Sequence, residues 1–216
     1  MIHRTPQTLF PTSQGVALVV GLALVTLALA VPSSAHAGAA DHARKLVDTF
    51  KAVKAPPEGA KLSDKDKAAN KKTFAELDKL FDFDTFTASC VKTVADKLDP
   101  AQSKAVRDDI VGIVRARAYP RGGQIFAEGE VKEGKAGKQG DLQTFDISIY
   151  FPKQDLTMDI LFVFGGDGRI VDVHLDDDSL TKDFRVQFAR FLGKKSAAEL
   201  VTRLGGKRKE AEKANE

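Results

Sequence analysis

The sequence predicts an α+β fold in which helices pack on one face of a curved antiparallel sheet of four strands. Three observations support this prediction. Apolar residues recur at helical spacing from 41 to 118, they alternate with polar residues in much of 124–175, and helical spacing returns from Leu180 onward. Helices that precede and follow a run of strands are typical of α+β domains, so the N-terminal and C-terminal helices should cover the same sheet.

The stretch 156–175 shows most clearly why strands are expected. In Leu156–Phe164 every second residue from Leu156 is apolar, which predicts a strand with one apolar face. The glycines of 165–168 tolerate positive φ, so the chain can reverse into a second strand over 169–175. Two earlier strands are predicted over 124–131 and 142–151, joined by a mobile polar loop at 134–140. The four strands should form one antiparallel meander.

The helices before the sheet follow from apolar stripes. A first amphipathic helix is predicted over 41–54, and the lysine-rich and aspartate-rich segment 61–72 is expected to be a solvated linker or the outer face of a helix. The apolar pattern resumes at Thr73 and continues through 86–98 and 100–118.

Three short motifs mark the boundaries of these helices. Asp82 or Asp84 is suited to cap the helix that contains Phe86, and Asp99 followed by Pro100 is suited to begin the next one. The sequence Pro-Arg-Gly-Gly at 120–123 is expected to end the helical half of the chain.

After the sheet, two further helices are predicted over 180–192 and 197–204. Gly205 and Gly206 should end the second one, because glycine readily adopts the conformation that closes a helix. The residues 206–216 are then expected to form a charged, flexible tail.

The first 37 residues are predicted to be a secretory signal peptide. Residues 1–15 carry Arg4 and no acid, 16–31 form an apolar run, and Ala35 and Ala37 give the small-x-small pattern of a cleavage site. The apolar run is short for a membrane span of about 20 residues. The expected organisation is therefore a signal peptide at 1–37, a single domain at 38–205 and the tail at 206–216.

Composition argues against several classes of protein. The chain is 43% apolar and 29% charged, as in globular proteins, and its net charge of +3 is weak for a nucleic-acid-binding protein. Cys90 is the single cysteine, which excludes an internal disulfide and a cysteine-based metal cluster. Its apolar surroundings predict a buried, unreactive thiol. No cysteine follows the apolar run to carry a lipid, so the exported protein should be free in its compartment.

No catalytic motif is found in the sequence. It contains no Gly-x-Ser-x-Gly elbow, no His-Glu-x-x-His and no phosphate-binding loop. His174 stands alone on a predicted strand and is expected to be structural. The acidic run 176–178 could suit a calcium ion, but with Ser179 it is better explained as a cap at the start of the following helix. We expect no enzyme activity, no cofactor and no metal.

Phenylalanine is unusually frequent for a chain of this length. There are fourteen phenylalanines, two tyrosines and no tryptophan, and the phenylalanines lie on helix stripes and on the apolar faces of strands. These rings could fill a core or could line a cavity for an apolar ligand. The residue pattern leaves both interpretations open.

Three segments carry a resemblance to a known family. The segment 168–188 contains Ser179-Leu180 and Arg185-x-x-Phe188, the segment 80–86 reads Leu-Phe-Asp-Phe-Asp-Thr-Phe, and 98–102 reads Leu-Asp-Pro-Ala-Gln. In order and spacing they resemble the MlaC/toluene-tolerance family, with its Val-Ser-Leu, Asn-Tyr-Arg-x-x-Phe, Phe-Asp-Phe and Ser-Pro-Glu-Gln motifs. Phe184 stands where the family usually has tyrosine, and the tryptophan that commonly follows Phe-Asp-Phe is absent.

The resemblance implies a function and its partners. The expected fold is MlaC-like (NTF2-like), and the expected protein is a soluble periplasmic carrier, auxiliary to an ABC transporter, that binds a phospholipid by its acyl chains. It would shuttle this lipid between an outer-membrane lipoprotein/porin complex and an inner-membrane ABC transporter complex with a lipid-binding MCE-type subunit, and so serve outer-membrane lipid asymmetry. The protein is expected to be a monomer and to bind no nucleic acid.

The residues expected to line the lipid pocket are apolar and come from the helices and from the strand faces. They are Phe81, Phe83, Phe86, Val94, Ile113, Phe145, Ile147, Ile149, Met158, Ile160, Phe162, Phe164, Phe184 and Phe188.

Two other functions remain open from the sequence. One is a small exported enzyme on the same NTF2-like fold, in which Asp146, Asp159 or His174 would face the cavity. The other is a non-catalytic interaction module whose core is filled.

Overall fold

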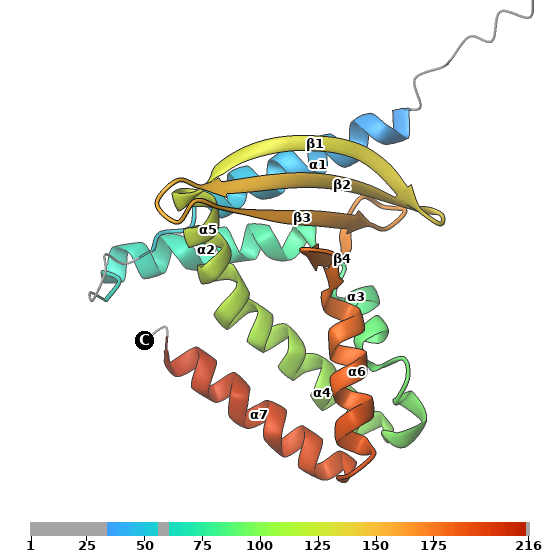
Figure 1. The fold of residues 1–216 in the computed structure, drawn as a ribbon. Helices are drawn as coiled ribbons and strands as arrows, with labels where there is room; N and C mark the ends of the chain where they lie inside the picture. Colours follow the sequence, from blue (N-terminus) through green and yellow to red (C-terminus); the bar gives the residue numbers. More distant parts are fainter. Residues whose placement is uncertain (1–33, 56–60, 215–216) are drawn as a thin grey trace, which may run out of the picture. The chain divides into compact units, whose positions relative to one another are not determined.

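The computed structural model describes residues 34–55 and 61–214, which form helices, then strands, then helices (Figure 1). Positions 1–33 of the predicted signal peptide lie outside the described residues, and positions 34–37 form the first turn of helix α1. Of the helices in the described ranges, none has both the length and the apolar character needed to cross a membrane.

The sheet is an antiparallel meander, which confirms the predicted α+β architecture. Its strands follow one another in the order of the sequence, and the fifth is a two-residue strand that was not predicted. The strands are β1 (Glu130–Gln139), β2 (Leu142–Phe151), β3 (Leu156–Phe164), β4 (Ile170–Leu175) and β5 (Asp178–Ser179). The register places Phe145 opposite Phe162 and Ile147 opposite Ile160, so one face of the sheet is apolar.

Five α-helices precede the sheet and two follow it in the described part of the chain. Those before the sheet are α1 (Ser34–Lys51), α2 (Asp64–Leu80), α3 (Phe83–Val91), α4 (Pro100–Ile113) and α5 (Tyr119–Glu128). A short 3-10 turn, η1 (Ala95–Lys97), precedes α4, and a π-helical segment, η2 (Val114–Ala118), joins α4 to α5. The helices after the sheet are α6 (Leu180–Leu192) and α7 (Ala197–Lys213).

Asp82, Asp99 and Ser179 cap helices as predicted, whereas the acidic run 176–178 does not supply the cap of α6. The Asp82 carboxylate accepts a hydrogen bond from the Thr85 backbone N–H at the start of α3. Asp99 forms a reciprocal capping box with Gln102 at the start of α4, where Pro100 is the first helical residue. Ser179 caps α6, whereas Asp176 and Asp177 form the preceding turn with positive φ.

The prediction of a strand over 124–131 is wrong, because most of this segment belongs to α5. Gly122 and Gly123 do not end the helical half. A Cβ atom on Gly122 would lie 2.6 Å from the Phe50 ring, and one on Gly123 would lie 2.7 Å from the Val53 side chain. The glycines therefore allow α5 to approach α1 closely. The first strand begins later, at Glu130, and continues to Gln139 through most of the segment 134–140 that was expected to be a loop.

Helix α7 also differs from the prediction, since it continues through Gly205 and Gly206 to Lys213. Packing against α4 explains the extension. Ala211 is buried, and the Arg208 guanidinium lies 3.7 Å from the Asp109 carboxylate of α4. Tertiary contacts therefore override the weak helix propensity of the two glycines.

The apolar side chains of the described residues form two clusters. In the first, the apolar face of the sheet packs against α1, α5 and Leu77 of α2. The second is built mainly from helices, in which α4 packs on α7 and α3 packs on α6. Phe83, Val114 and Leu180 contact both clusters and so connect them.

Candidate ligand-binding site

An apolar cavity of about 180 Å³ lies between the apolar face of the sheet and the helices that cover it. Phe50 of α1, Phe83 and Phe86 of α3, and Ile125 of α5 line the helical side. Strands β3 and β4 supply the opposite wall. Among the described residues that line the cavity, Arg121 is the only charged one, and its exposed side chain donates a hydrogen bond to Gln124. The cavity is therefore an apolar space with one cationic group on its wall.

The structure brings five of the predicted pocket residues together around this cavity. They are Phe81, Phe83, Phe86, Ile160 and Phe162. The rings of Phe81 and Phe83 are stacked with centroids 5.4 Å apart, and Phe83 meets Phe86 edge-on. The Phe-Asp-Phe segment thus supplies an aromatic wall, because the Asp82 cap directs the chain into α3 between these rings.

The other predicted pocket residues lie elsewhere, and their role in binding stays a prediction. Four are buried in the sheet cluster, and Met158 packs against its edge. The four buried residues are Phe145, Ile147, Ile149 and Phe164. Val94 is buried in the helical cluster, and three residues line a separate groove between the C-terminal helices. These three are Ile113, Phe184 and Phe188.

Several cavity residues were not predicted from the sequence. Tyr119, Ile125 and Phe126 were missed because the segment after 118 was expected to leave the helical half. Phe50 lies on the apolar stripe of α1, so its burial was predictable. The residues that Phe50 faces across the cavity were not predictable. Leu175 continues the strand alternation, a local signal that could have identified it, and the structure pairs it with Ile160.

Tyr119 anchors the helical wall through a polar network. Its side chain is fully buried, and its hydroxyl donates a hydrogen bond of 2.9 Å to the Asp78 carboxylate of α2. Arg115 donates to the same carboxylate oxygen at 2.9 Å, and its guanidinium lies 5.3 Å from the Phe83 ring centroid. Burial, together with the charge of Asp78, raises the pKa of Tyr119 well above its usual range. The phenol therefore remains a neutral donor, which fixes the cavity wall to α2.

The π-helical segment η2 lies directly beside this network. Pro120 has no backbone N–H, and the Tyr119 N–H bonds to the Val114 carbonyl five residues earlier. Val114 and Ala118 at the two ends of the segment both line the cavity. The irregular turn thus allows α4 and α5 to follow one another despite the proline.

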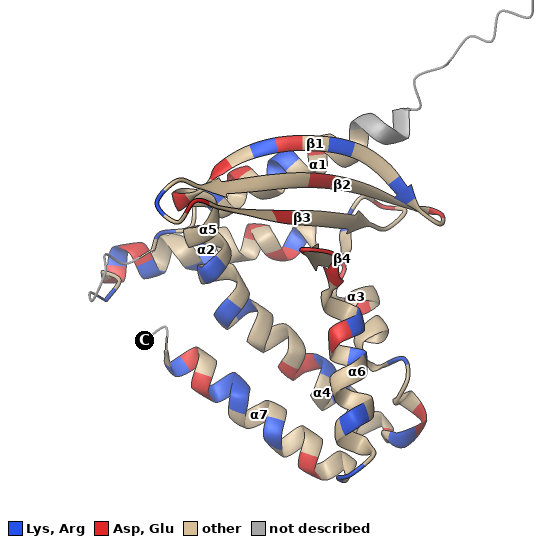
Figure 2. Cartoon of the chain, in the orientation of Figure 1, with Lys and Arg blue, Asp and Glu red and all other residues tan. Residues whose placement is uncertain are grey.

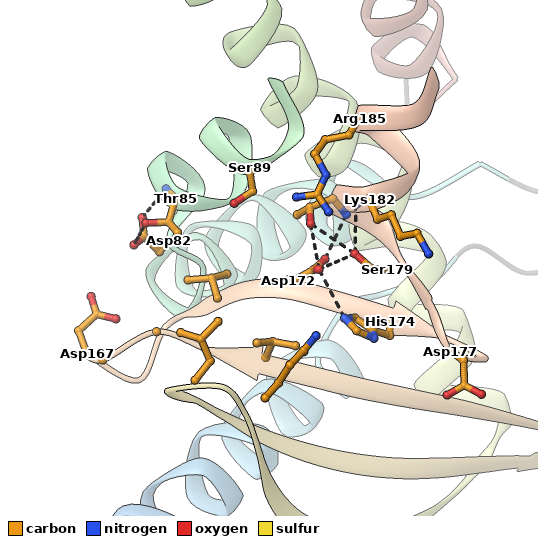
Figure 3. Close-up of a pocket in the computed structure, with 17 residues that line it drawn as sticks. Asp82, Thr85, Ser89, Asp167, Asp172, His174, Asp177, Ser179, Lys182 and Arg185 are labelled. Atoms are coloured by element: carbon orange, nitrogen blue, oxygen red, sulfur yellow. Dashed lines mark hydrogen bonds and ion pairs between the residues drawn. The ribbon is translucent and has the colours of Figure 1, made fainter. Parts of the chain in front are cut away.

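A second, polar pocket of about 750 Å³ lies on the other face of the sheet, beside α3 and α6 (Figure 3). Its centre is Asp172 of β4. The Asp172 carboxylate accepts hydrogen bonds from the Ser179 hydroxyl at 2.6 Å and from the Thr181 hydroxyl and backbone N–H at 2.9 and 3.1 Å. His174 Nε2 lies 3.5 Å from the same carboxylate. The carboxylate thereby ties β4 to the start of α6.

The polar pocket does not have the geometry of a serine hydrolase. The Ser179 hydroxyl donates to Asp172 and accepts from the Lys182 backbone N–H as a helix cap, whereas a nucleophile needs a histidine base as its partner. Cys90 is fully buried, and burial raises the pKa of its thiol to about 12. No group of three or more metal-ligating side chains occurs within 34–55 and 61–214.

The three residues considered for an enzyme lie on the face of the sheet opposite the apolar cavity. The register aligns Asp146, Leu161 and His174 in one row, and the alternate row of Phe145, Phe162 and Val173 belongs to the core. The backbone N–H of Lys135 donates to Asp146, and the hydroxyl of Ser148 donates to Asp159. Neither carboxylate can therefore act on a ligand in the apolar cavity.

The cavity is small for an elongated ligand. Ligand pockets commonly measure about 300–1,000 Å³, and an engineered apolar cavity of about 150 Å³ accommodates benzene. The observed 180 Å³ lies between these sizes. A long hydrocarbon chain would therefore require the helical wall to move away from the sheet.

Comparison with known proteins gives no matching family model and no matching curated protein. Among solved structures, the chain is similar to a phospholipid-binding protein from Ralstonia solanacearum in complex with a phospholipid. The two share 13% sequence identity with a TM-score of 0.59, and the alignment covers 82% of this chain and 98% of the other. At this identity the similarity establishes the fold.

Proposed function

We propose that the chain is a soluble periplasmic carrier that holds a phospholipid by its acyl chains. The observation that carries the proposal is the apolar cavity, whose walls are aromatic and aliphatic and whose single charged lining residue, within the described part of the chain, is Arg121. The structural neighbour from Ralstonia solanacearum, which has the same fold, was solved with a phospholipid and adds support.

The physical need for such a cavity follows from the hydrophobic effect. Exposure of an acyl chain to water costs about 0.8 kcal/mol for each CH₂ group, so an unshielded lipid crosses an aqueous compartment very slowly. An apolar cavity removes most of this cost without any chemical step. We therefore propose a carrier without catalytic residues, cofactor or metal.

The proposed carrier exchanges lipid between membrane complexes. By the resemblance of its sequence motifs, the donor and acceptor would be an outer-membrane lipoprotein/porin complex and an inner-membrane ABC transporter complex with an MCE-type subunit. A bilayer shields acyl chains as well as the cavity does, so transfer between them is nearly balanced. The direction of transport would then be determined by the partners.

The cavity must enlarge for this function, and the helical wall is the part that we propose to move. The wall from Val114 to Phe126 contacts the sheet side of the first cluster through side-chain packing, and its hydrogen bond through Tyr119 is to Asp78 of α2 and not to the sheet. The opposite wall belongs to a hydrogen-bonded sheet. Separation of packed side chains requires less rearrangement than the breaking of strand pairs.

The direct experiment is native mass spectrometry of the protein purified from periplasm, together with uptake of a fluorescent phospholipid from phosphatidylcholine vesicles. We expect co-purified phospholipid and measurable uptake. Protein that is repeatedly free of phospholipid and takes up none from vesicles would rule out the proposal.

A matched pair of variants assigns the uptake to this cavity. Leu175 is 37% exposed and lines the cavity, whereas Leu142 is 38% exposed and lines the polar pocket on the other face. Leu175→Trp should reduce uptake at least about fivefold because the indole occupies the space, and Leu142→Trp should leave uptake unchanged. Equal uptake by the two variants would show that the lipid binds elsewhere.

A further inference from the structure

A groove of about 630 Å³ lies between α6 and α7, at the end of the molecule remote from β1 and β2. We call it the basic groove. Among the residues that the structure describes, six cationic side chains line it and no carboxylate does. The cations are Arg117, Arg190, Lys194, Lys195, Arg203 and Lys207. Figure 2 shows the Lys and Arg positions along α6 and α7.

The floor of the basic groove is hydrocarbon. Leu200 and Leu204 of α7 and Phe188 of α6 are buried beneath it, and Phe184 and Phe191 are half-buried along its side. Gln187 is the only uncharged polar side chain among the lining residues. A ligand in the groove would therefore meet positive charge and apolar surface but few directional hydrogen-bonding groups.

Most of these cations have no acidic partner within the described ranges. Lys195 pairs with Glu199 at 3.0 Å, and the Arg203 guanidinium lies 5.7 Å from the Phe191 ring centroid. The other four cations take part in no ion pair among the residues that the structure describes. So many like charges around one depression create a positive potential that attracts an anionic surface.

We infer that the basic groove is the surface by which the protein docks on an anionic phospholipid bilayer. Interfacial binding combines burial of apolar side chains with attraction of Lys and Arg to anionic headgroups. In the groove the half-buried Phe184 and Phe191 offer apolar surface, and the six cations offer the attraction. A helical protein partner would need a defined register, which is normally specified by matched polar groups, and the groove supplies one such group in Gln187. A fluid lipid surface needs no register.

The inference goes beyond the proposed cavity function, because it concerns a different surface. The basic groove and the apolar cavity nevertheless lie close together. Ile113 and Arg117 line the groove, whereas Val114 and Ala118, one residue further along the same helical stretch, line the cavity. On α6, Phe184 of the groove lies one turn after Leu180 of the cavity. Docking at the groove would therefore place the cavity near the membrane surface.

The test is co-sedimentation of the protein with vesicles of phosphatidylcholine alone and with vesicles that contain an equal amount of phosphatidylglycerol. We expect binding to the anionic vesicles that falls as salt is added, and little binding to the neutral ones. The double variant Arg190→Gln and Lys194→Gln should bind the anionic vesicles about thirtyfold more weakly, since it removes two cations near the surface.

The control variant carries the same change of charge elsewhere. Lys65 and Lys71 lie exposed on α2, outside the groove, and the double variant Lys65→Gln and Lys71→Gln should keep full binding. Circular dichroism and thermal unfolding of both variants verify that they are folded. Equal binding of the wild type to both kinds of vesicle, or an equal loss in both variants, would overturn the inference.

Two further measurements distinguish a membrane from an acidic protein partner, and docking at the groove from lipid uptake into the cavity. Binding of soluble polyglutamate that depends on Arg190 and Lys194, without binding to vesicles, would overturn the membrane assignment in favour of an acidic protein partner. Uptake of phospholipid from neutral vesicles reports on the cavity alone. A protein that takes up lipid there but does not bind anionic vesicles would refute this inference and leave the proposed function intact.

Discussion

Phe162 and Phe191 place the same side chain in two different environments. Phe162 lies between the sheet and the helical wall, where its neighbours are apolar, whereas Phe191 lies at the basic groove beneath the guanidinium of Arg203. Among the described residues, the first environment has Arg121 as its single charged lining residue, whereas the second has six cations over an apolar floor. The surroundings of a ring, more than its identity, therefore determine whether it is suited to hold hydrocarbon or to meet a charged surface.

The strongest test of this difference compares one truncation in each region. Phe164 is 1% exposed in the sheet cluster, and Phe164→Ala should lower the free energy of unfolding by roughly 3–5 kcal/mol. Phe184 is half-buried at the groove, and Phe184→Ala should cost about 1 kcal/mol, because much of that ring already meets water. Urea denaturation measures both values, and equal losses would show that the two clusters are equally well packed.

A smaller effect tests the polar junction between β4 and α6. Asp172→Asn replaces the carboxylate that accepts the Ser179 and Thr181 hydrogen bonds with a neutral amide. This change should lower the free energy of unfolding by roughly 1.5–3 kcal/mol. The control is Asp177→Asn in the exposed turn before β5, where φ is 71° and asparagine is well tolerated. This control should be nearly neutral in the same denaturation experiment. A neutral Asp172→Asn variant would contradict the structural role of the carboxylate.

The smallest expected effects come from two glycines that should respond in opposite directions. Gly123→Ala introduces a Cβ atom 2.7 Å from Val53 and should destabilise by roughly 1–3 kcal/mol. Gly206→Ala adds a methyl group within α7 where no atom lies within 4 Å, and should stabilise by about 1 kcal/mol. Thermal unfolding distinguishes the two signs. Destabilisation by both variants would mean that α7 is not a regular helix at Gly206.

The strands β2, β3 and β4 were predictable because their alternation is a local property of the sequence. The caps at Asp82 and Asp99 were predictable for the same reason. The error at α5 has a tertiary cause. Gly122 and Gly123 locally indicate the end of a helix, but their missing side chains make room for Phe50 of α1 and for Val53 just after α1, about 70 residues earlier in the chain.

The candidate site was predictable in part. The Phe-Asp-Phe segment and the residues of β3 were identified because a strong local pattern places them on apolar faces. The contribution of Tyr119 depends on Asp78, which lies 41 residues earlier, and no local pattern indicates that contact. The basic groove was missed because its cations are distributed over η2, α6, α7 and the turn between α6 and α7, and only packing brings the charges together.

Cys90 gives the protein a built-in reporter of motion. The thiol is 0% exposed within the helical cluster, so a water-soluble alkylating reagent can reach it only when that cluster opens. Its single occurrence in the chain means that one covalent adduct corresponds to one opening event. The rate of alkylation therefore measures how often the helical cluster separates, and the change of that rate on lipid binding or membrane docking would show how strongly each event is coupled to the opening.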